Sequence, residues 1–279
     1  MDMNFLQESS FITLEKRAFD AIQRIFPCEQ ELLDKVPLEK IVGHFQSDLI
    51  SQEFPFLIRI AGQSGSGKSS QIAPAIEASL QNKDYVKINV GSFASFHPKY
   101  DEWQKSCPDQ MREKTNGFAL RALVMFYKHC ILNRVNILFD MTLLEPEIDL
   151  YLMTLAQKMN YKIQTHVLCV PRKISNLFIH LRQLKTGRLV KASSSDYFFN
   201  ALAPCLSALT HSGLFTSKDK LILWSHYLTY PIQKTHLNNS AVMNVLGKYR
   251  QGPLCIKNPK TLLKAKKRWM KQLMEEWDV

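Results

Sequence analysis

A glycine-rich loop constrains the fold of this chain more than any other part of its sequence. Residues 62–69 read Gly-Gln-Ser-Gly-Ser-Gly-Lys-Ser and match the phosphate-loop pattern GxxxxGK[ST] at every position. They lie between an apolar run at 56–61 and a stretch of helical periodicity at 69–81, which is the context that the pattern requires. Such a loop points backbone N–H groups at phosphate oxygens, and the following helix adds the positive end of its dipole. The sequence predicts nucleotide-phosphate binding by Gly62, Gln63, Ser64, Gly65, Ser66, Gly67, Lys68, Ser69 and Ser70.

Individual residues of this motif have separate predicted roles. Lys68 would reach the β and γ phosphates, and the Ser69 hydroxyl would ligate Mg²⁺. Asp140 closes the apolar run 135–140 as a Walker B carboxylate does, so that it can hold Mg²⁺ directly or through water. An aspartate at a strand end can also simply cap the next turn. Thr142 is expected on the same side of the site.

The phosphate loop is part of a regular alternation of short apolar runs and longer segments of helical periodicity. The expected strands are 56–61, 85–90, 135–140, 163–170 and 221–224, and the expected helices are 69–81, 117–133, 147–160, 173–185 and 195–212. This alternation implies crossover connections and a parallel sheet covered on both faces, with ligands at the carboxyl ends of its strands. We expect an α/β fold, a P-loop kinase-like parallel β-sheet flanked by helices.

Segments of helical periodicity also lie outside that core. We expect a helical N-terminal extension at 1–54 with two or three short helices, a kinase domain at 55–230 and a helical C-terminal appendage at 231–279. The appendage ends in an amphipathic stretch whose basic residues cluster between 257 and 271. The favoured interpretation is a solvated helix face whose apolar side docks on the domain, and the alternative is a patch for membrane surfaces or nucleic acid.

Composition limits the class of protein and its partners. The 279 residues are 46% hydrophobic and 22% charged, which excludes disordered and fibrous chains. The 36 Lys and Arg against 25 Asp and Glu give a net charge of +11, which favours anionic partners. The six cysteines form no CxxC pair or zinc-ligand cluster, the first residues do not have the pattern expected of a Sec signal, and no run of about 20 apolar residues occurs. These features predict a soluble, cytoplasmic protein with reduced thiols.

Two arginines follow the fourth expected strand. Arg182 lies in a helix-like segment, and Arg188 follows within Lys185-Thr186-Gly187-Arg188. The planar guanidinium binds phosphate oxygens in pairs, so these arginines suit the charge on a transferring phosphoryl group. From the residues alone, two solvated surface arginines in a basic protein are the favoured interpretation.

Several segments, in order and at compatible spacing over residues 55–230, resemble the zeta toxin family, P-loop kinases of toxin–antitoxin systems. The matching segments are the phosphate loop, Ser92–Trp103 with its Phe-x-x-x-His-Pro pattern, Phe-Asp-Met-Thr at 139–142, the arginines Arg182 and Arg188, and 202–224. The resemblance implies an ATP- and Mg²⁺-dependent kinase that phosphorylates a hydroxyl of a small metabolite. In characterised members this metabolite is UDP-N-acetylglucosamine, and another nucleotide is the other candidate.

The resemblance also implies roles for particular residues. Lys68 and Ser69 would act at the phosphates and Mg²⁺, Arg182 and Arg188 would form a positive clamp, and Asp140 would serve the metal or the acceptor. The residues expected on the acceptor side are Asn89, Phe93, His97 and Thr142. An antitoxin or inhibitor protein is an expected partner, and delivery into another cell as a toxin or effector stays open.

The chain departs from the family at the position of the catalytic base. Gly91 stands where the family usually has an aspartate, and Asn89 stands where another acidic residue is often found. A lost base typically costs about 10²- to 10⁴-fold in rate. Asp140 is the best available carboxylate, followed by Asp101. Two other functions therefore stay open: a nucleotide-binding interaction module without kinase chemistry, and a nucleic-acid-end kinase suggested by the net charge, with nucleic acid the less favoured partner.

Overall fold

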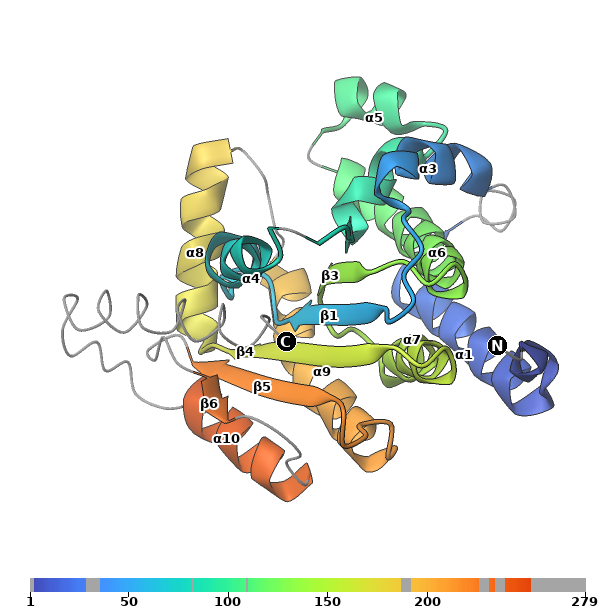
Figure 1. The fold of residues 1–279 in the computed structure, drawn as a ribbon. Coiled ribbons are helices and arrows are strands. Elements are labelled where there is room, and N and C mark those ends of the chain that lie inside the picture. Colours follow the sequence, from blue (N-terminus) through green and yellow to red (C-terminus); the bar gives the residue numbers. More distant parts are fainter. Residues whose placement is uncertain are drawn as a thin grey trace. The chain divides into compact units, whose positions relative to one another are not determined.

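The structure is a computed structural model that describes residues 3–28, 36–81, 83–108, 110–186, 192–225, 231–233 and 239–251 (Figure 1). Arg188 and the basic stretch 257–271 lie outside these described residues. The chain divides into two compact units, each described by itself below. Unit 1 comprises Met1–Leu57, Tyr85–Phe139 and Glu145–Lys162, and unit 2 comprises Ile58–Asp84, Asp140–Leu144 and Ile163–Val279. The proposed domain boundaries at 54 and 230 stay a prediction.

A six-stranded sheet has the order β2-β3-β1-β4-β5-β6. Its strands are β1 (Phe56–Ala61), β2 (Val86–Asn89), β3 (Ile137–Met141), β4 (Lys162–Cys169), β5 (Lys220–Ser225) and β6 (Pro231–Gln233). The first five strands are parallel, which confirms the expected fold class; β4 and β5 pair from Gln164 opposite Lys220 to Cys169 opposite Ser225. Every residue of β1 is buried, as expected for a central strand of a parallel sheet. The antiparallel β6 was not expected, because three residues carry no readable periodicity.

Unit 1 is mainly helical. It contains the α-helices α1 (Ser9–Ile25), α3 (Leu38–His44), α5 (Tyr100–Ser106), α6 (Met111–Leu132) and α7 (Pro146–Lys158), with 3-10 turns η1 (Asn4–Gln7), η2 (Gln46–Asp48) and η4 (Val90–Phe96). Glu15 of α1 accepts hydrogen bonds from Lys128 of α6 and Tyr151 of α7, each at 2.7 Å. These contacts hold α1, a single helix of 17 residues rather than one of several short ones, against α6 and α7.

Unit 2 carries the phosphate loop, the helical segment directly after it and the last helices of the described chain. After the loop come the π-helical turn η3 (Lys68–Ile72), then α4 (Ala73–Ser79), α8 (Arg172–Thr186), α9 (Ala192–His211) and α10 (Asn239–Gln251), and α10 packs on α9 and β5. The helix expected at 69–81 is therefore shorter and begins with a wide turn. Pro74 has no N–H to donate to the carbonyl of Ser70, so a regular α-helical ladder cannot run through this point.

Within the described part of the chain, no helix combines the length and the apolar character needed to cross a bilayer.

Candidate active site

The phosphate loop between β1 and η3 depends on its glycines. Gly65 has φ +75° and Gly67 has φ +96°, both in the left-handed region that side chains disfavour. A Cβ at Gly65 would lie 2.2 Å from the carbonyl oxygen of Ser175 and 3.0 Å from Ile179, so no other residue fits there without movement. The sequence therefore specifies a tightly curled loop packed directly against α8.

The ammonium group of Lys68 lies over the start of this loop. Its Nζ donates to the carbonyl oxygen of Gly62 at 2.7 Å and to that of Gln63 at 3.4 Å. The side chain is half-buried and turned back along the loop that its own backbone closes. An ammonium held there can meet the phosphates of a nucleotide that the loop's backbone binds.

Ser69 and Asp140 meet beside the loop, although 71 positions separate them in sequence. The Ser69 hydroxyl donates to Oδ2 of Asp140 at 2.9 Å. Asp140 is the penultimate residue of β3 and is half-buried, while Ser69 is exposed to solvent. A hydroxyl and a carboxylate are hard oxygen ligands, so the pair fits Mg²⁺. Among the described residues no group of three or more His, Cys, Asp or Glu could hold a metal ion, so water and phosphate would complete this coordination.

Gln63 belongs to the loop, but its side chain contacts α8. Its Nε2 donates to the carbonyl oxygen of Val170 at 2.6 Å and to Oγ of Ser175 at 2.9 Å, and the residue is 1% exposed. Within the described residues, neither Oε1 of Gln63 nor Oγ of the buried Ser66 has a hydrogen-bond partner. Ser64 is buried and Ser70 is exposed. The motif predicted phosphate binding through backbone N–H groups and gave no direction for the side chain of Gln63, so phosphate binding by the backbone of this residue stays a prediction.

Arg182 is the one described member of the predicted arginine clamp. It is half-buried on α8, one turn after Ile179. The side chain of Ile179 packs close to Gly65 of the loop. Arg188 lies outside the described residues, so its place in a clamp stays a prediction.

The predicted acceptor-side residues of unit 1 lie in η4 and at its two ends. Asn89 caps this turn: its Oδ1 accepts from the backbone N–H of Ser92 at 3.2 Å, and its Nδ2 donates to Oγ of Ser92 at 2.8 Å. Phe93 is fully buried, with its ring 5.9 Å from Phe45 and 5.6 Å from Phe126. Asn89 and Phe93 thus have clear structural roles, and their contact with an acceptor stays a prediction.

His97 is also packed into unit 1. It is 3% exposed, and its Nδ1 accepts a hydrogen bond from the backbone N–H of Lys99 at 3.0 Å. Its ring lies 4.6 Å from Trp103 and 5.0 Å from Phe118. The Phe-x-x-x-His-Pro pattern therefore stabilises a rigid turn in this structure, and a role of His97 in binding an acceptor stays a prediction.

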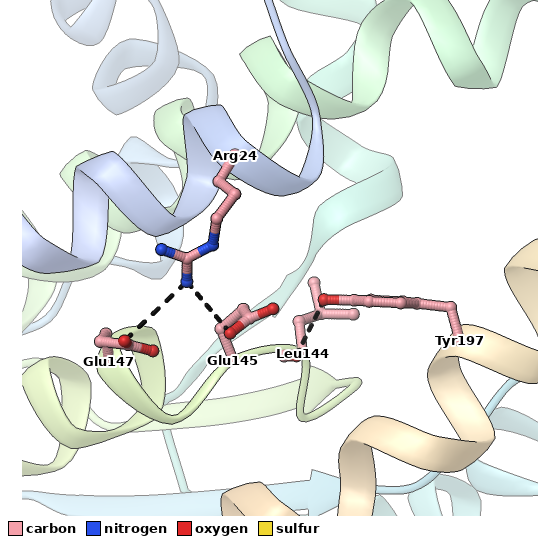
Figure 2. Close-up of polar contacts among 5 residues, drawn as sticks. All are labelled: Arg24, Leu144, Glu145, Glu147 and Tyr197. Carbon is pink, nitrogen blue, oxygen red and sulfur yellow. Dashed lines mark hydrogen bonds and ion pairs between the residues drawn. The ribbon is translucent and has the colours of Figure 1, made fainter.

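The segment after β3 is held by contacts that the sequence did not reveal (Figure 2). In unit 2, Thr142 is half-buried, and the Tyr197 hydroxyl of α9 donates to the carbonyl oxygen of Leu144 at 3.2 Å. In unit 1, the Arg24 guanidinium of α1 lies 3.2 Å from Glu145 and 3.8 Å from Glu147. The acidic residues of the first turn of α7 were the available signal, because helix starts favour negative charge, but nothing identified Arg24 as their partner.

A parallel sheet, a glycine-dependent phosphate loop and a serine–aspartate pair beside that loop define a P-loop nucleotide-binding domain of the kinase type. The family model for zeta toxin matches residues 42–224. The chain therefore belongs to the zeta toxin family, as the resemblance of its motifs led us to expect.

Two individual proteins illustrate this relationship. The toxin zeta of Streptococcus agalactiae is 24% identical over 186 residues, and the match covers 64% of this chain and 64% of that relative's length. A solved structure from the PezAT chromosomal toxin–antitoxin system of Streptococcus pneumoniae has a TM-score of 0.64 at 20% identity, covering 85% of this chain and 96% of its own. At that identity the second likeness shows the fold.

Proposed function

We propose that this chain is an ATP-dependent kinase that transfers the γ-phosphate to a hydroxyl group of a small metabolite. The observation that carries the proposal is the 2.9 Å contact between Ser69 and Asp140 beside the phosphate loop. Such a pair of oxygen ligands is the arrangement that P-loop enzymes use for Mg²⁺. The acceptor class that the family resemblance favours is a sugar nucleotide such as UDP-N-acetylglucosamine, or another nucleotide.

Several residues in and around the loop have a role in this reaction. Lys68 and the backbone N–H groups of the loop hold the β and γ phosphates, and Ser69 with Asp140 holds Mg²⁺. Bound Mg²⁺ supplies positive charge that neutralises the phosphate oxygens during transfer. Arg182 and Arg188 add guanidinium groups for the same charge. The acceptor oxygen forms the new bond to the γ phosphorus, the bond to the β-phosphate oxygen breaks, and ADP leaves.

A carboxylate is the group expected to accept the proton of the acceptor hydroxyl. Gly91 has no side chain, and the amide of Asn89 cannot take a proton and is engaged with Ser92. Asp140 is the best candidate for the base, and the exposed Asp101 of α5 is the second. Phosphoryl transfer depends mostly on positioning and on charge stabilisation, so activity without a dedicated base is chemically reasonable.

A protein partner is part of this proposal. The PezAT relative comes from a toxin–antitoxin system, and the family resemblance implies an antitoxin or inhibitor protein for this chain. We place the kinase in the cytoplasm of the cell on whose metabolites it acts.

The absence of a carboxylate at positions 89–91 favours one other candidate function. In it, the chain binds ATP and recognises a protein, but it transfers no phosphate. The net charge of +11 alone supports a nucleic-acid-end kinase more weakly, because surface charge promotes nonspecific binding to any polyanion.

The decisive experiment is incubation with γ-labelled ATP, Mg²⁺ and a metabolite extract. We expect label on one small molecule with the wild-type protein, no label with Lys68→Ala, and full labelling with Lys105→Ala, which removes an exposed lysine of α5. ATP binding without any labelled product would instead support the interaction module. Label on added oligonucleotides, with binding that weakens steeply as salt rises, would support the nucleic-acid kinase.

A further inference from the structure

The side chain of Gln63 leaves the phosphate loop and joins it to α8. One of its hydrogen bonds ends on the carbonyl oxygen of Val170, at the end of β4, and the other ends on Oγ of Ser175, in the first turns of α8. With 1% of the residue exposed, a nucleotide cannot reach this amide without displacing those partners. Gln63 therefore holds two protein segments together.

Gly65 brings the same two segments into direct contact. The 2.2 Å that would separate a Cβ at Gly65 from the carbonyl oxygen of Ser175 shows how closely the loop backbone lies against α8. Ile179, one turn further along α8, is 5% exposed and approaches the same glycine. The loop thus contacts α8 at Gln63 and at Gly65. A movement of α8 would change the position of its side chains relative to the loop.

Arg182 lies on the face of α8 that meets the loop. Ser175, Ile179 and Arg182 follow the spacing i, i+4, i+7, which places them along one side of a helix. The opposite side carries exposed apolar side chains, at Leu177, Leu181 and Leu184. The contacts of Gln63 and Gly65 therefore determine where the face that carries Arg182 is held relative to the loop.

We propose that Gln63 is a positioning residue that acts through Ser175 and α8 to hold Arg182 at the phosphates, and that its side chain does not bind nucleotide. This inference rests on the proposed function, in which Arg182 stabilises charge on the transferring phosphoryl group. A displacement of about 1 Å at a reacting group can cost about 100-fold in rate. A helix that is tied to the loop by the buried hydrogen bond between Gln63 and Ser175, and by the close packing at Gly65, is protected from such a displacement.

The test uses Gln63→Leu, which keeps the size of the side chain and removes both donors. We expect kcat to fall about 10- to 100-fold while KM for ATP stays within about twofold. Ser175→Ala removes one of the two hydrogen bonds and should show a smaller loss of kcat. The control is Gln183→Leu, the same substitution on α8 away from the loop contact, which should keep wild-type kcat.

A double-mutant cycle separates positioning from a general loss of stability. If Gln63 acts through Arg182, Gln63→Leu should reduce kcat less than about twofold in a protein that already carries Arg182→Ala. If the two losses multiply instead, the inference is wrong. A rise in KM for ATP that accounts for the whole loss would also overturn it, because that result means that Gln63 binds nucleotide.

Hydrogen exchange gives a readout that needs no turnover. In the wild-type protein, ATP with Mg²⁺ should slow amide exchange in both the phosphate loop and residues 172–186. In Gln63→Leu the nucleotide should protect the loop alone, and equal protection of both segments would contradict the inference. If the wild-type protein binds ATP but transfers no phosphate, the kinase proposal fails and the exchange result decides the inference by itself. If it binds no nucleotide, both fail.

Discussion

At the scale of single residues, the chemistry of the site depends on two oxygen atoms from distant parts of the chain. Ser69 is the second residue of η3, and Asp140 is the penultimate residue of β3. Each side chain alone has an ordinary structural explanation, since serine and aspartate both cap turns. Their 2.9 Å contact beside a phosphate loop is what favours a metal site.

Replacing Asp140 with asparagine tests that metal site. The amide keeps the shape of the side chain but removes its charge, so the Mg²⁺ concentration for half-maximal ATP binding should rise about tenfold. Calorimetric titration of ATP at several Mg²⁺ concentrations measures this change. Asp20→Asn, on the exposed side of α1, should leave the Mg²⁺ dependence unchanged. The same Mg²⁺ dependence in wild type and Asp140→Asn would reduce Asp140 to a turn cap.

Sequence patterns located these residues better than they described their side chains. The motif and the strand end were sufficient to expect Ser69 near Asp140, because both flank the carboxyl end of parallel strands. They could not show that Gln63 points at α8 or that Phe93 and His97 are buried. A family pattern fixes which residue types recur, whereas the direction of a side chain depends on neighbours that are distant in sequence.

At the scale of secondary-structure elements, β4 and β5 share a buried polar group. The indole Nε1 of Trp224 donates to Nδ1 of His166 at 3.0 Å, and the two rings stack with centroids 5.6 Å apart. Nε2 of His166 lies 2.8 Å from the side-chain amide of Gln164. Burial lowers the pKa of His166 from 6.5 to about 3, so the folded protein keeps this imidazole neutral.

This buried histidine predicts a loss of stability in acid. Between pH 6.5 and pH 3 the unfolded chain binds a proton at His166 and the folded chain does not, so the free energy of unfolding falls as pH falls. The contribution is fully present above pH 6.5 and decreases by about 2 kcal/mol between pH 7 and pH 5. Urea unfolding at a series of pH values measures it.

The matched variant is His166→Asn, whose side-chain oxygen can still accept from the Trp224 indole. It should be less stable overall at pH 7, but its stability should fall by about 2 kcal/mol less than that of the wild type on going to pH 5. Parallel pH curves for the two proteins would show that His166 does not carry this dependence.

Periodicity predicted the existence of the main elements more reliably than their ends. All five expected strands are present, because continuous apolar runs of four to eight residues are typical of buried parallel strands. The helix after the phosphate loop starts late because of Pro74, and α6 starts at Met111 rather than 117 because its first turns are polar. The short elements η4, α5 and β6 were missed, since three to seven residues give too little pattern to read.

At the scale of the whole molecule, a ligand that binds only the folded chain must stabilise it. ATP with Mg²⁺ at about 100 times its Kd should add about 2.7 kcal/mol to the free energy of unfolding, which corresponds to a rise in Tm of about 5–10 °C. Differential scanning fluorimetry measures this shift. Lys68→Ala should lose most of the shift, while Lys105→Ala should keep it. An unchanged wild-type Tm at saturating ATP would contradict nucleotide binding.

Fold class and family membership could both be predicted at this scale, because the order and spacing of motifs over residues 55–230 restrict the topology strongly. The acceptor could not be predicted in the same way. A role of Thr142 on the acceptor side stays a prediction, and at Gly91 this chain departs from the family pattern. Substrate specificity follows from the shape and charge of a pocket, and such properties do not follow from the fold.

The hydrogen bonds of Lys68 within the phosphate loop affect which ligands the loop can bind. Its ammonium already donates to the carbonyl oxygens of Gly62 and Gln63, so a ligand must compete with these two acceptors. A phosphate oxygen carries negative charge, so it adds a Coulomb attraction to the ammonium that a neutral carbonyl oxygen does not offer. The charged oxygens of a polyphosphate can displace these carbonyl oxygens, whereas a nucleoside has only neutral acceptors, which bind the ammonium no more strongly than the carbonyl oxygens do. Lys68 is therefore expected to make the loop selective for ligands with negative charge, whatever the shape of the rest of the pocket.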